Sequence, residues 1–572
     1  NNETTGNVGI GVETGFYNQT GQFNTLIGTG AGFGASEQSN SNNTAVGYAA
    51  LNVVTTGGQN TAVGKNSGDS LTDGTYNTFM GYYAGATTTS ATRTVAIGTE
   101  AMESGNVTSA AEGAIAIGSK ALHDLTSGAG NIAIGKDSLS KVTTGGSNVA
   151  IGDTALEDIV TGGANIAIGR NAGKEMGAAE NGNILIGMAA GQSLDEGDNG
   201  LIDSNIAIGK DCFIGGNLNT ASTVVKGNIA IGTDSLNSTG TNAQTGTIAI
   251  GHEALTALTS GAGNTAVGYK SLTALTDGDR NTVVGYEAAL SLSSGTNNTV
   301  FGYEALKNED GHGKNTVFGT QALFTLNAGA DGHNTAIGFQ SGDSMSTGTS
   351  NTLVGSSTGR TIAGGSTNTI VGKDSNVTDA GATNRNGFGS GISLGQNNSV
   401  VIGNSDVTDV YMAQDERAKM HSGQIEVTAD SGTNAVTAFI RTENNSNFSA
   451  SVLNVQGDRT TTNNTYNLAN FTNAGTAKCV ITDGGDLKNA NNSYGAISDE
   501  KLKQDIADAN SQWDDIKAVR FRKFKFKDMV EEGFKLGVVA QEIEKVSPKL
   551  ISEAIDRDVD GKDLGTTTKS VK

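Results

Sequence analysis

A five-residue unit, Asn-Thr-Ala-Val-Gly or a close variant, recurs along the chain between Asn7 and Gly372. Thirteen of the twenty intervals between its closing glycines are 17 residues, and the others run from 18 to 23. The residue before that glycine is Val or Ile in 18 of 21 copies, and the central residue is Ala in twelve. Because β-branched residues fit a pleated surface, each copy predicts one short β-strand.

Side chains of a strand alternate between its two faces. In the copy at residues 43–47, Thr44 and Val46 therefore share one face, and Asn43, Ala45 and Gly47 share the other. We expect the β-branched face to be buried within each chain. The small Ala/Gly face lets another backbone approach closely, so we expect it to be the contact between chains. As an alternative, the same small residues pack inside one flattened roll.

A second half-repeat follows each closing glycine, as in Tyr48-Ala-Ala-Leu51 and Ser119-Lys-Ala-Leu122, with a small residue and then Leu, Met or Gly. Clusters of Thr, Ser, Gly and Asp then supply turn residues. The pattern predicts two short strands plus turns in about 17 residues, which is too short for a βαβ unit. The fold class that it indicates is a mainly all-β, elongated β-solenoid in which each coil pairs with its neighbours. A single coil has little apolar mass, so we expect a homotrimer.

Composition supports an extended repeat rather than a globule. Among 572 residues there are 82 glycines and one proline, and aromatic residues make up 5%. Glycine has no every-third period, which excludes collagen. The net charge of −21 makes nucleic acid and anionic membranes poor partners. There is no run of 18 apolar residues, so no membrane insertion is expected. The chain begins at Asn1 in mid-pattern without Met, so we expect the protein to extend further N-terminally.

Two features argue against a metal or cofactor. Cys212 and Cys479 lie far apart, and the five histidines show no paired ligand spacing. The turn Asn308-Glu-Asp-Gly311 offers Glu309 and Asp310 to Ca²⁺, but two carboxylates fall short of the six to eight oxygens that this ion takes. We therefore predict solvated turns and no metal or cofactor.

The repeat resembles the head repeats of trimeric autotransporter adhesins and, more closely, the Asn-Thr-Ala-x-Gly-Tyr-x-Ala-Leu repeats of phage tail fibres. This resemblance covers residues 7–403 and implies a parallel β-roll in three chains, with an intertwined triple β-helix as the alternative. The copies at Asn386-Gly-Phe-Gly389 and Ser399-Val-Val-Ile-Gly403 fall closer together, as in a terminating cap. From there to Ala496 we predict a β-rich trimeric neck, with strands that include residues 477–481.

Composition changes after Ala496, where Lys and Arg become frequent and the only Trp and the only Pro occur. We expect a helix over residues 501–516 and strands over 519–521 and 524–526. A buried strand over 537–541 then leads into a helix over 542–546, which Pro548 ends.

Two motifs in this segment resemble the intramolecular chaperone domain of endosialidase tailspikes. They are Ser498-Asp-Glu-Lys-Leu-Lys503 and Gly537-Val-Val-Ala-Gln-Glu-Ile-Glu-Lys-Val-Ser-Pro548. Lys501 departs from the family, which usually has Arg there. The resemblance implies self-cleavage between Ile497 and Ser498, with Ser498 as nucleophile and Lys503 as base. Alternatively, Ser498 is a helix N-cap, and both roles are compatible. Related domains usually continue into a long helix beyond Lys572.

These observations predict three regions: a repeat shaft over 1–403, a neck over 404–496 and a small α+β chaperone and auto-protease domain over 497–572. We predict a homotrimeric phage tail fibre, assembled in the host bacterial cytoplasm and carried on the virion. Its partners would be a host cell-surface glycan or protein receptor and, at its N-terminal end, other tail proteins. The alternatives are a polysaccharide-depolymerase tailspike and a bacterial trimeric autotransporter adhesin.

Overall fold

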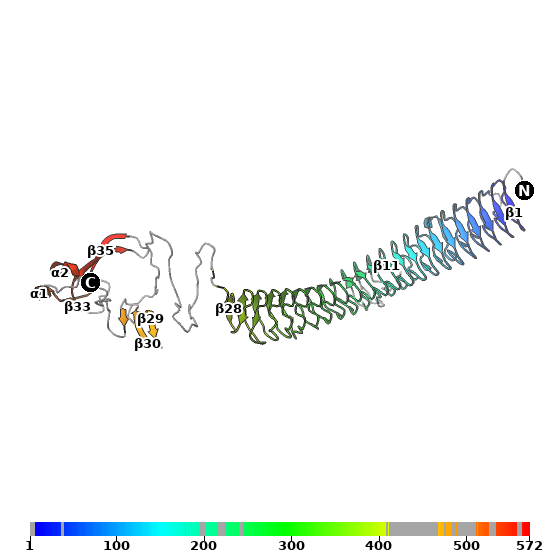
Figure 1. Cartoon of the computed structure of the whole chain (residues 1–572). Coiled ribbons are helices and arrows are strands. Elements are labelled where there is room, and N and C mark those ends of the chain that lie inside the picture. The colour runs from blue at the N-terminus through cyan, green and yellow to red at the C-terminus, as the bar shows by residue number, and fades with distance from the viewer. Residues whose placement is uncertain are drawn as a thin grey trace. The chain divides into compact units, whose positions relative to one another are not determined.

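The computed structural model describes residues 6–35, 39–177, 179–194, 201–215, 224–238, 244–407, 410, 467–473, 476–482, 487–489, 511, 513–525, 534–557 and 563–571. The chain divides into two compact units, Asn1–Glu416 and Arg417–Lys572. The first unit is a β-solenoid whose coils stack along one axis from β1 to β28 (Figure 1). Its main sheet has 23 parallel strands, one for each of the 21 copies of the repeat and two at the closely spaced copies that end it, so the predicted mainly-β solenoid with coils of about 17 residues is confirmed.

Successive strands of this sheet pair without slippage, for example Thr282 with Thr299 and Val284 with Phe301. At about 4.8 Å between neighbouring strands, 23 strands extend over roughly 105 Å. The strands are β1 (Val8–Ile10), β2 (Thr25–Ile27), β3 (Thr44–Val46), β4 (Thr61–Val63), β5 (Thr78–Met80), β6 (Val95–Ile97), β7 (Ile115–Ile117), β8 (Ile132–Ile134), β9 (Val149–Ile151), β10 (Ile166–Ile168), β11 (Ile184–Ile186), β13 (Ile206–Ile208), β15 (Ile229–Ile231), β17 (Ile248–Ile250), β18 (Thr265–Val267), β19 (Thr282–Val284), β20 (Thr299–Phe301), β21 (Thr316–Phe318), β22 (Thr335–Ile337), β23 (Thr352–Val354), β24 (Thr369–Val371), β26 (Arg385–Phe388) and β28 (Ser399–Ile402).

The buried face of this sheet is the face of the small residues. The central residue of every main-sheet strand from β2 to β24 is buried, as Ala45 and Ala62 are, whereas its two neighbours are half-buried or exposed. The prediction that the β-branched face is buried is therefore wrong, and so is the assignment of the Ala/Gly face as the contact between chains. The alternative, in which the small residues pack inside one chain's own roll, is confirmed. The reason is that Leu side chains such as Leu51 join these alanines in one buried cluster.

Large and small side chains alternate between the two halves of a coil. Where the central strand residue is Phe79, the facing residues of its own coil and of the preceding coil are Gly85 and Gly68. A Cβ on Gly85 would lie 2.6 Å from Phe79, and a Cβ on Gly68 would lie 2.8 Å from it. Seven of the twelve coils with a central Ala instead carry a buried Leu at that position, as at Leu122. The central strand residue and the residue facing it in the second half of the coil thus fill the interior together, and where one is large the other is small.

The second half-repeat is a ladder of turns rather than a strand. The φ angle is +52° at Ala49 and +50° at Leu51, so alternate residues leave the extended region. Their backbone N–H groups still bond to neighbouring coils, that of Ala49 to the carbonyl of Thr29 at 2.9 Å and that of Leu51 to the carbonyl of Ser67 at 3.0 Å. The predicted second strand is therefore wrong, although the backbone groups are satisfied as a strand would satisfy them.

The longer intervals between repeats are accommodated by insertions before the next strand. They add the 3-10 turn η1 (Ser109–Ala111) and a separate parallel sheet of β12 (Leu201–Asp203), β14 (Val224–Lys226) and β16 (Gln244–Thr245). Close to the end of the solenoid, β25 (Asn376–Val377) pairs with β27 (Ser393–Leu394). The main sheet keeps its register across all of these insertions.

In the second unit, the described residues form three small antiparallel sheets and two short helices. The sheets pair β29 (Asn467–Asn473) with β30 (Thr476–Thr482) and β31 (Leu487–Asn489), β32 (Arg522–Phe524) with β33 (Lys535–Gly537), and β34 (Ile551–Arg557) with β35 (Asp563–Val571). The helices are α1 (Trp513–Ala518) and α2 (Ala540–Val546), and the turn η4 (Pro548–Leu550) follows α2. The strand predicted over 477–481 lies within β30, and the helix end before Pro548 is confirmed.

Other boundaries in this unit differ from the prediction. Residues 519–521 are not a strand; β32 begins at Arg522, where its pairing with β33 begins. The strand predicted over 537–541 ends at Gly537 and is not buried. The described part of the helix predicted over 501–516 begins at Trp513.

Candidate functional site

The predicted cleavage residues Ile497, Ser498 and Lys503 lie outside the described residues. Their roles therefore stay predictions. The structure does describe the second motif, which runs from Gly537 at the end of β33 through α2 to Pro548.

The second motif lines a cavity of about 410 Å³ together with the end of the last strand. Val538, Val539, Ala540 and Gln541 supply one wall. The remaining lining residues are Phe524, Lys569, Ser570 and Val571. The motif is therefore the place where β32, α2 and β35 meet.

Two ion pairs tie α2 to the flanking strands. Arg522 of β32 donates to both carboxylate oxygens of Glu542, from Nε at 2.9 Å and from Nη2 at 2.6 Å. Lys569 of β35 donates to both oxygens of Glu544 at 2.8 Å. The hydrogen bond from Arg522 lowers the pKa of the Glu542 carboxyl. The hydrogen bond to Glu544 raises the pKa of Lys569. These paired charges position the helix, because two-pronged Arg–carboxylate contacts fix orientation as well as distance.

The part of the second unit that follows Ser511 leaves large apolar side chains in contact with solvent. Among its described residues, Ile543 is the single buried apolar side chain. Phe521 is 72% exposed and Leu536 is 75% exposed, and Trp513 and Phe534 are exposed as well.

In the solenoid, a column of asparagines forms a buried hydrogen-bonded ladder. The first residue of the unit is Asn in 18 of 21 copies. At Asn148, the side-chain carbonyl accepts the backbone N–H of Asn165 at 3.0 Å and its side-chain amide at 3.1 Å, while the Asn148 amide donates to the carbonyl of Gly162 at 2.9 Å. The alternation of the sequence places these asparagines on the face of the small residues but does not predict the ladder. Their recurrence at the first position of the unit is the signal that indicates it.

The ladder ends at Arg385, which is 3% exposed. Its backbone N–H donates to the side-chain carbonyl of Asn368 at 2.9 Å, just as the backbone N–H of an asparagine in the ladder donates to the asparagine before it. Its guanidinium donates to the side-chain carbonyl of Asn397 at 2.8 Å, to the backbone carbonyl of Leu394 at 2.6 Å and to Asp379. The arginine thus closes the column beneath the last strands, which agrees with a terminating cap.

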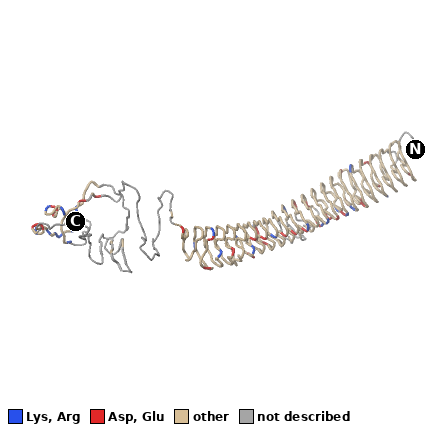
Figure 2. Tube along the Cα trace, viewed as in Figure 1, with Lys and Arg blue, Asp and Glu red and all other residues tan. Residues whose placement is uncertain are grey.

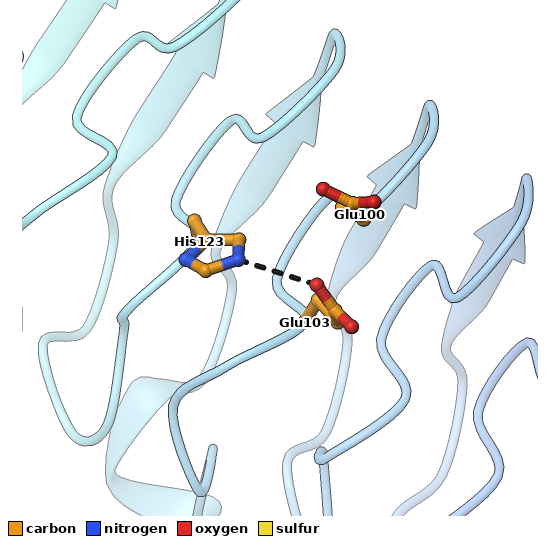
Figure 3. A group of neighbouring side chains, drawn as sticks. All are labelled: Glu100, Glu103 and His123. Atoms are coloured by element: carbon orange, nitrogen blue, oxygen red, sulfur yellow. Dashed lines mark hydrogen bonds and ion pairs between the residues drawn. The ribbon is translucent and has the colours of Figure 1, made fainter.

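Two groups of carboxylates and imidazoles could each offer three ligand atoms to a metal. In the first, the ligand atoms of Glu100, Glu103 and His123 lie within 4.8 Å of one another (Figure 3). His123 contacts Glu103 at 3.2 Å through Nε2 and Asp124 at 2.6 Å through Nδ1. Lys120 lies 3.6 Å from Glu100 and offers a competing positive charge. We assign no metal to this group.

The second group lies at the turn that was predicted to be solvated. Glu309 is fully buried, which corrects that prediction. Its carboxylate accepts the backbone N–H groups of His312 at 3.2 Å and Ala328 at 3.1 Å, and it lies 3.0 Å from Nδ1 of His312. Asp310 completes the group at the surface. Because two backbone N–H groups from different coils donate to Glu309, its carboxylate stabilises the turn.

The repeated tyrosines form a column on the outside of the solenoid. The rings of Tyr269, Tyr286 and Tyr303 stack with centroids 5.0 and 5.1 Å apart. Further towards the N-terminus, Lys65 lies between two tyrosines of the same column and faces the Tyr82 ring at 5.5 Å. The spacing is close to that of neighbouring strands, so the column is a structural ladder.

Residues 498–552 match the family model described as "Chaperone of endosialidase". None of the curated proteins matches the chain. The match begins at Ser498 and includes the second motif on α2. The chain therefore carries an endosialidase-type chaperone domain after a long β-solenoid, and the match implies autoproteolysis. Among the described residues, no helix has the length and apolar character needed to cross a membrane.

Proposed function

We propose that this chain is a phage tail fibre protein whose chaperone domain brings three copies together and is then released. The observation that carries the proposal is the family match that begins at Ser498, downstream of a 23-strand solenoid. Domains of this kind are typical of phage tail fibres and tailspikes. The exposed apolar side chains of the described chaperone region, such as Phe521 and Leu536, support association with other copies.

Release follows from chemistry at the junction between Ile497 and Ser498. The Oγ of Ser498 adds to the carbonyl carbon of Ile497, and its proton passes to a neutral Lys503. The C–N bond breaks, and the freed amine of Ser498 takes a proton. Water then hydrolyses the resulting ester and leaves Ile497 as a carboxylate. A serine hydroxyl needs a neighbouring base, and burial lowers a lysine pKa far enough to supply one.

After release, the shaft presents its outer surface to a receptor on the host cell. Its stability then rests on a high barrier to unfolding, since the chaperone that assisted folding has left. The virion is the resulting location, and the host bacterial cytoplasm is the place of assembly.

The test compares the chain with Ser498→Ala and Lys503→Ala on a denaturing gel. The wild type should give a shortened shaft and a small fragment whose N-terminal sequence starts at Ser498, and both variants should stay intact. Ser511→Ala, at an exposed serine of the same region, is the control and should be cleaved. If both variants are processed like wild type, the Ser/Lys assignment is wrong. Release of reducing ends from host capsule or lipopolysaccharide would instead favour a depolymerase.

A further inference from the structure

The outward face of the main sheet carries two columns of side chains, from the first and third strand positions. All 23 third positions are apolar: Val, Ile, Met or Phe. The first positions are Thr, Val or Ile, except for Asn386 in β26. Many of these side chains remain accessible; Ile134, Ile151 and Ile168 are each 37% exposed, and Ile337 is 40% exposed. An unbroken apolar stripe therefore runs along the whole sheet.

Neither column contains a charged residue, although 17% of the chain is charged. The charges of the solenoid, spread along its length in Figure 2, fall elsewhere in the coil. Lys141 pairs with Asp158 at 2.5 Å and Lys307 with Glu287 at 2.6 Å, all in the half-coil that follows the closing glycine. A solvated sheet face normally alternates apolar inward and polar outward residues. The absence of charge from this face indicates that another surface covers it.

The regularity of the stripe identifies what covers it. Insertions of one to six residues interrupt the repeat, yet they all lie outside the strands of the main sheet, and register is kept from one main-sheet strand to the next. The stripe therefore advances by one strand spacing per coil over its full length. A parallel copy of the same chain advances by the same step, so it matches the stripe coil by coil.

The area is sufficient for a stable contact. Three residues of a strand span about 10 Å and the sheet about 105 Å, which gives roughly 1,000 Å² per chain. A standard protein interface takes about 800 Å² from each partner. We propose that the outward face of the main sheet is the surface through which copies of this chain pack along the shaft. This proposal rests on the proposed function, which requires that chains associate. It assigns the contact between chains to the β-branched face, in place of the Ala/Gly face expected from the sequence.

Cysteine cross-linking in the full chain tests the proposal. Cys212 is first replaced by Ser, because Ser138 makes the equivalent contact to the preceding glycine carbonyl in another coil, and Cys479 is replaced by Ala. Ile151→Cys then places a thiol on the outward face, and Thr144→Cys places one on an exposed turn that leads to the same strand. Each variant is treated with a short bis-maleimide and run on a denaturing gel, and its native mass is measured by sedimentation.

We expect a three-chain particle in both variants. Ile151→Cys should shift from the one-chain to the two-chain band, while Thr144→Cys should not. Suppose that the particle has three chains, but Thr144→Cys gives the two-chain band or Ile151→Cys does not. Either result overturns the assignment of the face and leaves the proposed function standing. A one-chain particle overturns both. Thr282→Cys, on the same face in β19, repeats the test at a second height and guards against a local folding defect.

Discussion

The side-chain carbonyl of Asn281 accepts two hydrogen bonds from Asn298, one from the backbone N–H at 3.0 Å and one from the side-chain amide at 3.1 Å. Asn281 donates the same pair of bonds to Asn264, and its amide also donates to the carbonyl of Gly295 at 2.8 Å. Each asparagine therefore joins three coils at a buried position, where a lost partner leaves a polar group unsatisfied.

Asn281→Ala should destabilise the coils around β19 by about 2–5 kcal/mol, because each unsatisfied buried polar group costs about 1–3 kcal/mol. Faster hydrogen exchange at the Asn298 amide would report the loss locally. Asn281→Thr is the matched control, since Thr94 occupies this position in another coil and bonds to Asn77 at 2.6 Å. An alanine variant with unchanged exchange would show that the ladder does not hold the coils together.

The packing of Phe79 against Gly85 predicts a compensating pair. Phe79→Ala should cost about 3–5 kcal/mol through the cavity that it leaves. Gly85→Leu alone should also destabilise, because its side chain would meet the Phe79 ring. In the double variant, the leucine enters the space that the ring vacated, as in the coil that pairs Ala116 with Leu122. A double-mutant cycle on the thermal midpoint measures this coupling; strictly additive effects would contradict it.

Closing glycines differ from loop glycines in what surrounds them. The φ of Gly285 is +147°, and an added Cβ would lie 2.1 Å from the carbonyl oxygen of Gly302. Gly285→Ala should therefore separate two coils and lower the thermal midpoint strongly. Gly130 has a φ of +68° with open space around it, so Gly130→Ala should cost only about 1–2 kcal/mol of backbone strain. Equal losses in the two variants would refute the stacking explanation.

Burial raises the pKa of the Cys212 thiol from 9.0 to about 12. At neutral pH it should therefore resist maleimide labelling in the folded shaft and react once the shaft is unfolded, because the thiolate is the nucleophile. Since folding raises this pKa, the neutral thiol's contribution to stability is constant below pH 9.0 and declines as the pH rises from 9.0 towards 12. Rapid labelling of native protein at Cys212, located by peptide mapping, would contradict its burial.

The sequence predicts the strands well because each one is a local feature. Thr44, Ala45 and Val46 are followed by a glycine at a fixed interval, and this is enough to place β3. Which face points inward is not local. Alternation separates Ala45 from Val46, but only the leucines of the facing half-coil, such as Leu51, decide that the alanine is buried. The positive φ of Leu51 likewise follows from stacking, and residue type does not reveal it.

In the chaperone region, the motifs were recognised more reliably than the element boundaries. Pro548 ends α2 as expected, because proline cannot continue a helix. The strand expected at Phe521 instead begins at Arg522, since its limits depend on pairing with β33. The roles of Ser498 and Lys503 are predicted from the motif alone. Because both residues lie outside the described residues, the cleavage assay tests these roles.

Native mass spectrometry of the purified wild-type chain tests the central claim most directly. The unprocessed chain has a mass of 58.0 kDa. The account predicts a particle of three chains, each ending at Ile497, with the fragment that starts at Ser498 released. For Ser498→Ala it predicts three uncleaved chains. Single chains of 58.0 kDa in both samples, with no fragment in the wild type, would contradict it.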